Sequence, residues 1–174
     1  TQDDREVKFL RAELLIRDER PAEAELLLQA ACECSNEEQD HFIYDSIGIF
    51  MDYMLWDYAE SWCMRLKHIS PKYKGLPEIE AEIKMCTGDY DSAIDILNGI
   101  LDINSYNSQA WNMLAESYFS KGTFEEAMEA CQFALAINED DFKAISTLAD
   151  CYYHTSSFSK AHEYYEKALM MRQD

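Results

Sequence analysis

Residues 108–141 read SQAWNMLAESYFSKGTFEEAMEACQFALAINEDD, and the same arrangement of side chains recurs at intervals of 34 residues in both directions. An alanine column repeats at this interval, and an aromatic residue stands three positions before each alanine. The pairs are Trp56 with Ala59, Tyr90 with Ala93, Phe124 with Ala127, and Phe158 with Ala161. Because two independent columns keep one interval, we predict that the chain is built from repeats.

Each repeat contains two segments with helical periodicity. In the second segment of 108–141, Ala127, Cys131 and Ala134 form an i, i+4, i+7 stripe, which is one face of a helix. The first segment carries a similar face. Its residues are Trp111, Leu114, Ala115 and Tyr118. Glycine and small polar residues at 120–123 separate the two segments and permit a tight turn. Each repeat is therefore predicted to be a helical hairpin.

This pattern resembles the tetratricopeptide repeat family, whose repeats carry Trp, Leu, Gly and Tyr, then Ala, Phe and Ala, and finally Pro. The matching residues here are Trp111, Leu114, Ala115, Tyr118, Ala127, Cys131 and Ala134, with Glu139 in the proline position. The resemblance implies an all-α fold, a right-handed superhelical solenoid of helix-turn-helix hairpins.

We expect a single array over residues 1–174. The predicted repeats lie at 5–39, 40–73, 74–107, 108–141 and 142–174. The third repeat departs most from the family pattern, because Pro77 takes the tryptophan position and Lys84 the tyrosine position. The first repeat is recognisable mainly from its second helix, and atypical terminal repeats are expected because they pack on one neighbour only.

Composition limits the classes of partner. The chain has 174 residues, 48% of them apolar, and a formal net charge of -19. A surface with this much negative charge repels phosphate backbones and anionic lipid headgroups. We therefore expect that the protein neither binds nucleic acid nor inserts directly into a membrane. No apolar stretch approaches the roughly 20 residues of a membrane-spanning helix, and we expect a soluble protein.

The six cysteines favour a reducing compartment, because disulfide frameworks serve short secreted domains. We therefore expect a cytoplasmic location. The sequence begins at Thr1 without a methionine, so a signal peptide that had been removed would leave no trace in it.

Motifs of common enzymes are absent from the sequence. It contains no GxxxxGK[ST], GxGxxG, HExxH or GxSxG pattern. We expect no enzymatic activity and no cofactor, although a carboxylate cluster in a groove stays open as an alternative.

The cysteines are interpreted as packing residues and not as metal ligands. Cys151 and His154 have ligand-like spacing, but structural zinc typically needs two closely spaced ligand pairs, and the sequence has no CxxC. Cys63 and Cys131 occupy one column of the repeat, which suits a small apolar side chain. We therefore expect no metal site.

The family resemblance also implies a function. In tetratricopeptide arrays the first helices of successive hairpins line a concave groove that binds an extended peptide or a partner helix. The groove positions fall here on Phe9, Glu13, Tyr44, Gly48, Met51, Asp52, Glu78, Glu82, Met85, Asn112, Glu116, Phe119, Ser146, Asp150 and Tyr153. This acidic and aromatic surface predicts a non-catalytic interaction module, part of a larger scaffold or regulatory protein.

The predicted partner is a protein or peptide that is basic or rich in aromatic residues. Residues 74–107 carry seven acids against two bases, and residues 108–141 carry seven against one. One subfamily clamps C-terminal carboxylates with Lys, Arg and Asn in these positions, but Glu13, Glu78 and Glu82 would repel such a ligand here. The alternative is that the groove acids only keep the protein in solution.

A second hypothesis concerns the C-terminal helix, expected from about Phe158 to Met171. It carries more apolar side chains than one neighbouring hairpin can cover, and exposed apolar patches generally mark interaction surfaces. We expect either that the native chain continues past Asp174 or that the protein self-associates through residues 158–171, with the groove unused in the latter case.

Overall fold

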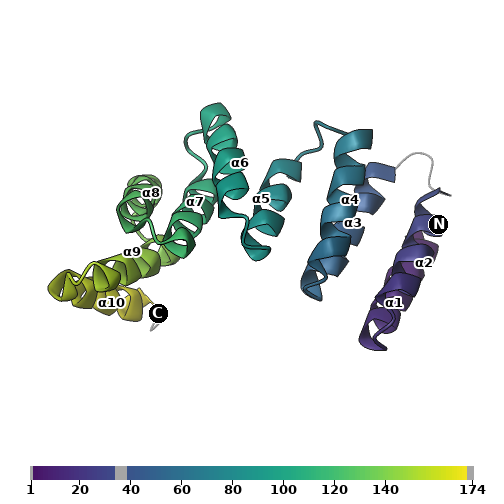
Figure 1. The fold of residues 1–174 in the computed structure, drawn as a ribbon, viewed down its shortest axis with the longest axis horizontal. Helices are drawn as coiled ribbons and strands as arrows, with labels where there is room; N and C mark the ends of the chain where they lie inside the picture. Colours follow the sequence, from purple (N-terminus) through teal and green to yellow (C-terminus); the bar gives the residue numbers. More distant parts are fainter. Residues whose placement is uncertain (1, 34–38, 172–174) are drawn as a thin grey trace. The chain divides into compact units, whose positions relative to one another are not determined.

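A computed structural model describes residues 2–33 and 39–171 (Figure 1). The described residues form ten helices and no strand. The helices are α1 (Gln2–Arg17), α2 (Pro21–Glu33), α3 (Gln39–Asp52), α4 (Trp56–Ile69), α5 (Leu76–Cys86), α6 (Tyr90–Ile103), α7 (Ser108–Lys121), α8 (Phe124–Ile137), α9 (Phe142–His154) and α10 (Phe158–Met171). The predicted all-helical fold is confirmed. Within the described ranges, none of the helices has both the length and the apolar character needed to cross a bilayer.

The aromatic column of the sequence marks helix starts. Trp56, Tyr90, Phe124 and Phe158 are the first residues of α4, α6, α8 and α10, and each of these helices has 14 residues. The starts are therefore 34 residues apart, as the sequence columns are. The periodicity in the sequence is thus a periodicity of helix pairs.

The chain divides into two compact units, residues 1–83 (unit 1) and residues 84–174 (unit 2). In unit 1, α1 packs on α2 and α3 on α4, and α3 also contacts the first two helices. In unit 2, each helix from α6 to α10 packs on the next, and α7 also packs on α9. The boundary falls inside α5, within the repeat that departs most from the family pattern. The single array and the repeat boundaries stay predictions.

The alanine column lies in the cores. Ala59, Ala93 and Ala127 have no exposed surface, and Ala161 is 2% exposed. A small side chain at these positions lets the facing helix approach closely, which a larger residue would prevent. The hairpins therefore depend on alanine in this column.

The cysteine column is buried as well. Cys63 and Cys131 both lie in the cores. Burial raises the pKa of the Cys131 thiol to about 12, so the group stays neutral near pH 7. This environment fits the packing role predicted for both residues.

One carboxylate fixes the start of α9 against α7. Asp141 caps α9, because its Oδ1 accepts hydrogen bonds from the backbone N–H groups of Lys143 (3.1 Å) and Ala144 (3.2 Å). Its Oδ2 accepts from Asn112 Nδ2 at 2.7 Å and from Ser108 Oγ at 2.8 Å. Partial burial opposes ionisation of Asp141, but the hydrogen bonds outweigh it and hold the pKa below its ordinary value.

The alanine column gives a first prediction. Replacing Ala127 by Leu should overpack the contact between helices and lower the free energy of unfolding by about 1–3 kcal/mol. Ala136→Leu, on the exposed side of the same helix, serves as the control and should change stability by less than about 0.5 kcal/mol. Urea denaturation measures both. Equal stability of the two variants would show that α8 has room at Ala127.

The Asp141 cap gives a second prediction. Asp141→Ala should destabilise the protein by about 0.5–2 kcal/mol at pH 7. Because the folded-state pKa is lowered, the ionic contribution is complete above the unfolded pKa of about 3.9 and is lost as pH falls through the folded value. Thermal unfolding measured from pH 7 to pH 3 should therefore show that the difference in stability between Asp141→Ala and the wild-type protein becomes smaller as the pH falls. The exposed neighbour Asp140, replaced by Ala, should leave stability and its pH dependence nearly unchanged.

Candidate functional site

The predicted groove residues lie on the odd-numbered helices of both units. Phe9 and Glu13 are on α1, Tyr44, Met51 and Asp52 on α3, Glu78, Glu82 and Met85 on α5, Asn112, Glu116 and Phe119 on α7, and Asp150 and Tyr153 on α9. The two units arrange their members differently, and each unit is considered by itself.

Unit 1 contains a pocket of about 560 Å³ between α3, the start of α4, and α5. Its lining residues are Tyr44, Asp45, Gly48, Ile49, Met51, Asp52, Trp56, Ile79 and Glu82. We call it the α3–α5 pocket. It brings together four of the predicted site residues, Tyr44, Met51, Asp52 and Glu82, and also Gly48, which the groove positions included.

The chemistry of the α3–α5 pocket combines apolar walls with carboxylates. Ile49, Ile79 and Trp56 supply apolar surface, whereas Asp52 and Glu82 are exposed acids. No residue in the described part of the chain forms an ion pair with either of these two acids. A Lys or Arg side chain suits such a pocket, because its methylene stem packs on apolar surface while its charge meets a carboxylate.

Gly48 gives the α3–α5 pocket part of its space. A Cβ built on Gly48 would meet no atom within 4 Å outside its own helix, and the backbone there is helical. A larger side chain at this position would therefore extend into open space without a clash. The position offers a way to fill the pocket while leaving the fold intact.

Four lining residues were not among the predicted groove positions, namely Asp45, Ile49, Trp56 and Ile79. Spacing indicates part of this set, since Asp45 lies three residues before Gly48, and Ile49 three residues before Asp52, on the same helix α3. Trp56, in contrast, begins α4 after a turn, and Ile79 lies on α5. Trp56 was assigned only to the aromatic column, which gives the position of a helix start and not the direction of its ring.

The other predicted residues of unit 1 do not line the α3–α5 pocket. Phe9 stacks on Phe42 at a ring distance of 4.9 Å and packs against the core. Glu13 and Glu78 are half-buried on α1 and α5. Met85 lies past the boundary at residue 83 and belongs to unit 2.

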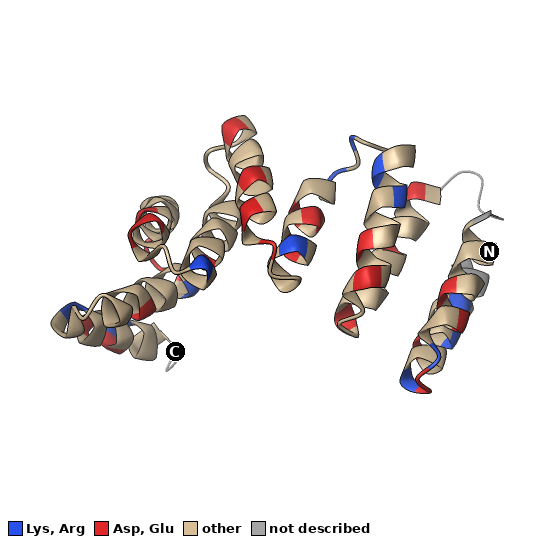
Figure 2. Cartoon of the chain, viewed as in Figure 1, with Lys and Arg blue, Asp and Glu red and all other residues tan. Residues whose placement is uncertain are grey.

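In unit 2, most of the predicted polar groove residues already have partners. Glu116 forms an ion pair with Lys143 at 3.0 Å, and Asp150 accepts a hydrogen bond from the Tyr165 hydroxyl at 2.5 Å. That bond, with some burial, raises the pKa of Tyr165 to about 12. Figure 2 shows acidic positions on helices of both units. In unit 2, Glu116 and Asp150 already interact with other residues of the protein.

Within the described part of the chain, Asn112 of unit 2 has a partner for only one of its two polar side-chain atoms. Its side chain is buried, and its amide nitrogen is held by Asp141, which fixes the orientation of the amide. Among the described residues, no group donates a hydrogen bond to its Oδ1. Because this oxygen is buried, it is not open to a ligand at the surface, and an ordered water is the partner that would suit it.

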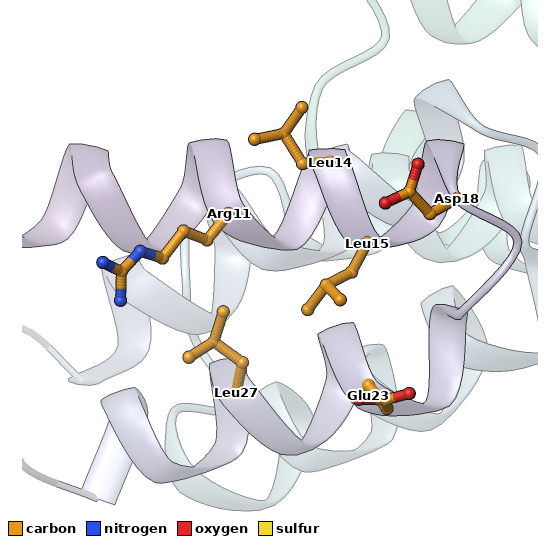
Figure 3. A pocket seen from close by; sticks show the side chains of 6 residues that line it. All are labelled: Arg11, Leu14, Leu15, Asp18, Glu23 and Leu27. Carbon is orange, nitrogen blue, oxygen red and sulfur yellow. The ribbon is translucent and has the colours of Figure 1, made fainter.

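A second pocket in unit 1, of about 470 Å³, lies between α1 and α2 (Figure 3). Leu15 and Leu27 point toward each other across it, and Arg11 lies at one end. Its Glu23 is paired with Arg20 at 2.6 Å. The predicted groove residues do not line this pocket, and the cation Arg11 is among its lining residues.

Cys151 and His154, whose spacing resembles that of metal ligands, do not lie together in a metal site. Cys151 is buried, whereas His154 is exposed and stacks on Phe124 at 5.0 Å. Within the described ranges, no three His, Cys, Asp or Glu side chains are grouped so that they could hold a metal ion. The absence of a bound metal stays a prediction.

Comparison with solved structures gives proteins of the same fold. MamA residues 41 to the end from Desulfovibrio magneticus RS-1 has a TM-score of 0.77 and 15% identity, covering 98% of this chain and 96% of that one. Another crystal structure of MamA has a TM-score of 0.73 and 17% identity, covering 93% and 94%. At such identities the likeness concerns the fold alone. No curated protein sequence matches the chain.

The sequence profile of the tetratricopeptide repeat family matches residues 87–132 and 118–174. Together the two matches span 88 of the 174 residues. They cover the helices from α6 to α10, whose buried alanine column and aromatic helix starts are the features of the repeat. The chain therefore belongs to the tetratricopeptide repeat family, whose members are generally non-catalytic protein-interaction and scaffold modules.

Proposed function

We propose that this chain is a non-catalytic interaction module that binds a basic peptide or partner helix through the α3–α5 pocket. The observation that carries the proposal is that Tyr44, Met51, Asp52 and Glu82, four groove positions inferred from the repeat pattern, line one pocket of about 560 Å³. The chain would serve as one segment of a larger scaffold or regulatory protein.

The charge of the pocket favours a cationic ligand. Asp52 and Glu82 stand on an acidic chain with a net charge of -19, and neither is neutralised by the described residues. A basic segment would be steered toward this field, and association would weaken as salt screens it. Ile49, Ile79 and Trp56 would hold the apolar stem of the bound side chain.

The remaining predicted groove positions stay proposed contacts of the same class of ligand. They are Phe9, Glu13, Glu78, Met85, Asn112, Glu116, Phe119, Asp150 and Tyr153.

Filling the pocket tests the proposal. Gly48→Leu should lower the affinity for basic peptides selected from a peptide library by at least about tenfold, because the new side chain occupies the pocket. The matched control is Gly99→Leu, a helical glycine in unit 2 whose Cβ would also meet no atom within 4 Å. Both changes should raise helix stability by up to about 1 kcal/mol. Isothermal titration calorimetry measures affinity, and circular dichroism checks the fold.

The charge of the site is tested in the same assay. Asp52→Asn combined with Glu82→Gln should weaken binding and flatten its salt dependence, while stability changes little because exposed charges contribute little. The exposed acids Asp95 and Asp102 on α6, neutralised together, form the control. If Gly48→Leu and Gly99→Leu bound the peptides equally well, the α3–α5 pocket would not be the binding site.

Self-association through residues 158–171 is the second candidate function. On α10, Leu169 is 59% exposed and Met170 is 67% exposed, which leaves adjacent apolar side chains at the surface. A second copy of the chain could cover them. Light scattering at high protein concentration should then detect a dimer or a larger species that Leu169→Glu with Met170→Glu dissociates. A wild-type monomer at all concentrations would rule this candidate out.

A further inference from the structure

Five aromatic rings meet at the hairpin turns of unit 2. Phe119 and Phe124 flank the turn between α7 and α8, and Tyr153, His154 and Phe158 flank the turn between α9 and α10. His154 stacks on Phe124 at 5.0 Å with an angle of 16° and meets Phe119 edge to face at 5.3 Å. Tyr153 contacts His154 at 5.9 Å and Phe158 at 5.6 Å, both edge to face. We call these five residues the aromatic edge.

The aromatic edge follows the repeat. Phe119 and Tyr153 occupy one sequence column 34 residues apart, and Phe124 and Phe158 occupy another. In unit 1 the same two columns hold Met51 and Trp56, both of which line the α3–α5 pocket. The edge is therefore the counterpart, in unit 2, of a surface that forms part of a pocket in unit 1.

The outer rings of the edge are open to solvent. Tyr153 is 55% exposed, Phe158 is 59% exposed, and His154 is exposed between them and the half-buried Phe119 and Phe124. A contiguous group of exposed aromatic side chains generally marks an interaction surface, because rings of this size contribute most when they are buried.

The electrostatic surroundings of the edge select a cation. Residues 84–174 carry 15 Asp and Glu against six Lys and Arg, and Glu125 is exposed next to Phe124. In the part of the chain that the structure describes, Arg65 lies over Trp62 and Lys160 over Tyr152, but no cation lies over the five rings. Lys121, near Phe119 in sequence, is paired with Asp91.

We propose that the aromatic edge binds an arginine side chain of an extended, basic partner segment, with the guanidinium group stacked on the exposed ring of Tyr153 or Phe158 and the arginine stem packed on the other. The rings of Tyr153 and Phe158 meet edge to face at 69°, so a planar guanidinium group can stack on the face of one ring while the methylene stem of the arginine packs on the other. The negative potential of the ring face attracts the guanidinium group. The inference does not depend on the α3–α5 pocket, which belongs to unit 1.

Arginine is favoured over proline for a physical reason. Proline-rich segments also dock on exposed aromatic surfaces, but such docking gains nothing from the negative charge of residues 84–174. A guanidinium group gains from both the rings and the field. The experiment must therefore distinguish binding of a proline-rich peptide from binding of an arginine peptide.

The test uses the peptide Ac-GRGRGR-amide, its citrulline analogue, which keeps the shape but removes the charge, and Ac-GPGPGP-amide. NMR of the aromatic side chains follows each titration in the Gly48→Leu protein, so that the α3–α5 pocket is filled. We expect the arginine peptide to shift the signals of Tyr153, His154 and Phe158, and the citrulline peptide to bind at least about fivefold more weakly.

Two variants and a control complete the experiment. Tyr153→Leu and Phe158→Leu keep apolar surface but remove a ring, and each should weaken arginine-peptide binding about threefold or more. The control is Tyr106→Ala, a highly exposed tyrosine of unit 2 outside the edge, which should bind as before. Equal binding of the citrulline peptide, stronger binding of the proline peptide, or no shift of the ring signals would each overturn the proposal.

Discussion

The close approach of two helices at an alanine is the interaction on which the rest of this structure depends. Ala59, where α4 packs on α3, and Ala127, where α8 packs on α7, have no exposed surface. This contact sets how near the two helices of a hairpin lie, and hence which residues reach the space beside them. Since a hairpin alone cannot bury its apolar face, the same contact makes each hairpin depend on its neighbours.

The repeated packing presents the same columns at each hairpin, and the residue types in them decide what the surface can bind. In the columns of Met51 and Trp56, a nearby glycine and carboxylates produce a pocket. In the same columns of unit 2, Phe119, Phe124 and their counterparts produce a group of rings in edge-to-face contact. One scaffold thus carries an acidic pocket in one unit and an aromatic surface in the other.

Acidic residues have different roles in the two units. Asp141 of unit 2 binds four donors and holds α9 against α7, while Glu116 is paired with Lys143. The exposed acids of the α3–α5 pocket have no such partner among the described residues, so their charge is available to a ligand. The net charge of the chain is therefore a poor guide to where a basic partner would bind, and the local pairing of each carboxylate is a better one.

The sequence by itself determined the helices, their pairing into hairpins and the family, because the 34-residue columns record which side chains must be small and which must be buried. It also predicted Tyr44, Met51, Asp52 and Glu82 as groove positions. Only the tertiary structure decided that these four line one pocket with Ile79, that Glu116 is neutralised, and that His154 joins rings from two hairpins. The reason is that periodicity gives the face of a helix, whereas contacts between helices depend on packing between residues distant in sequence.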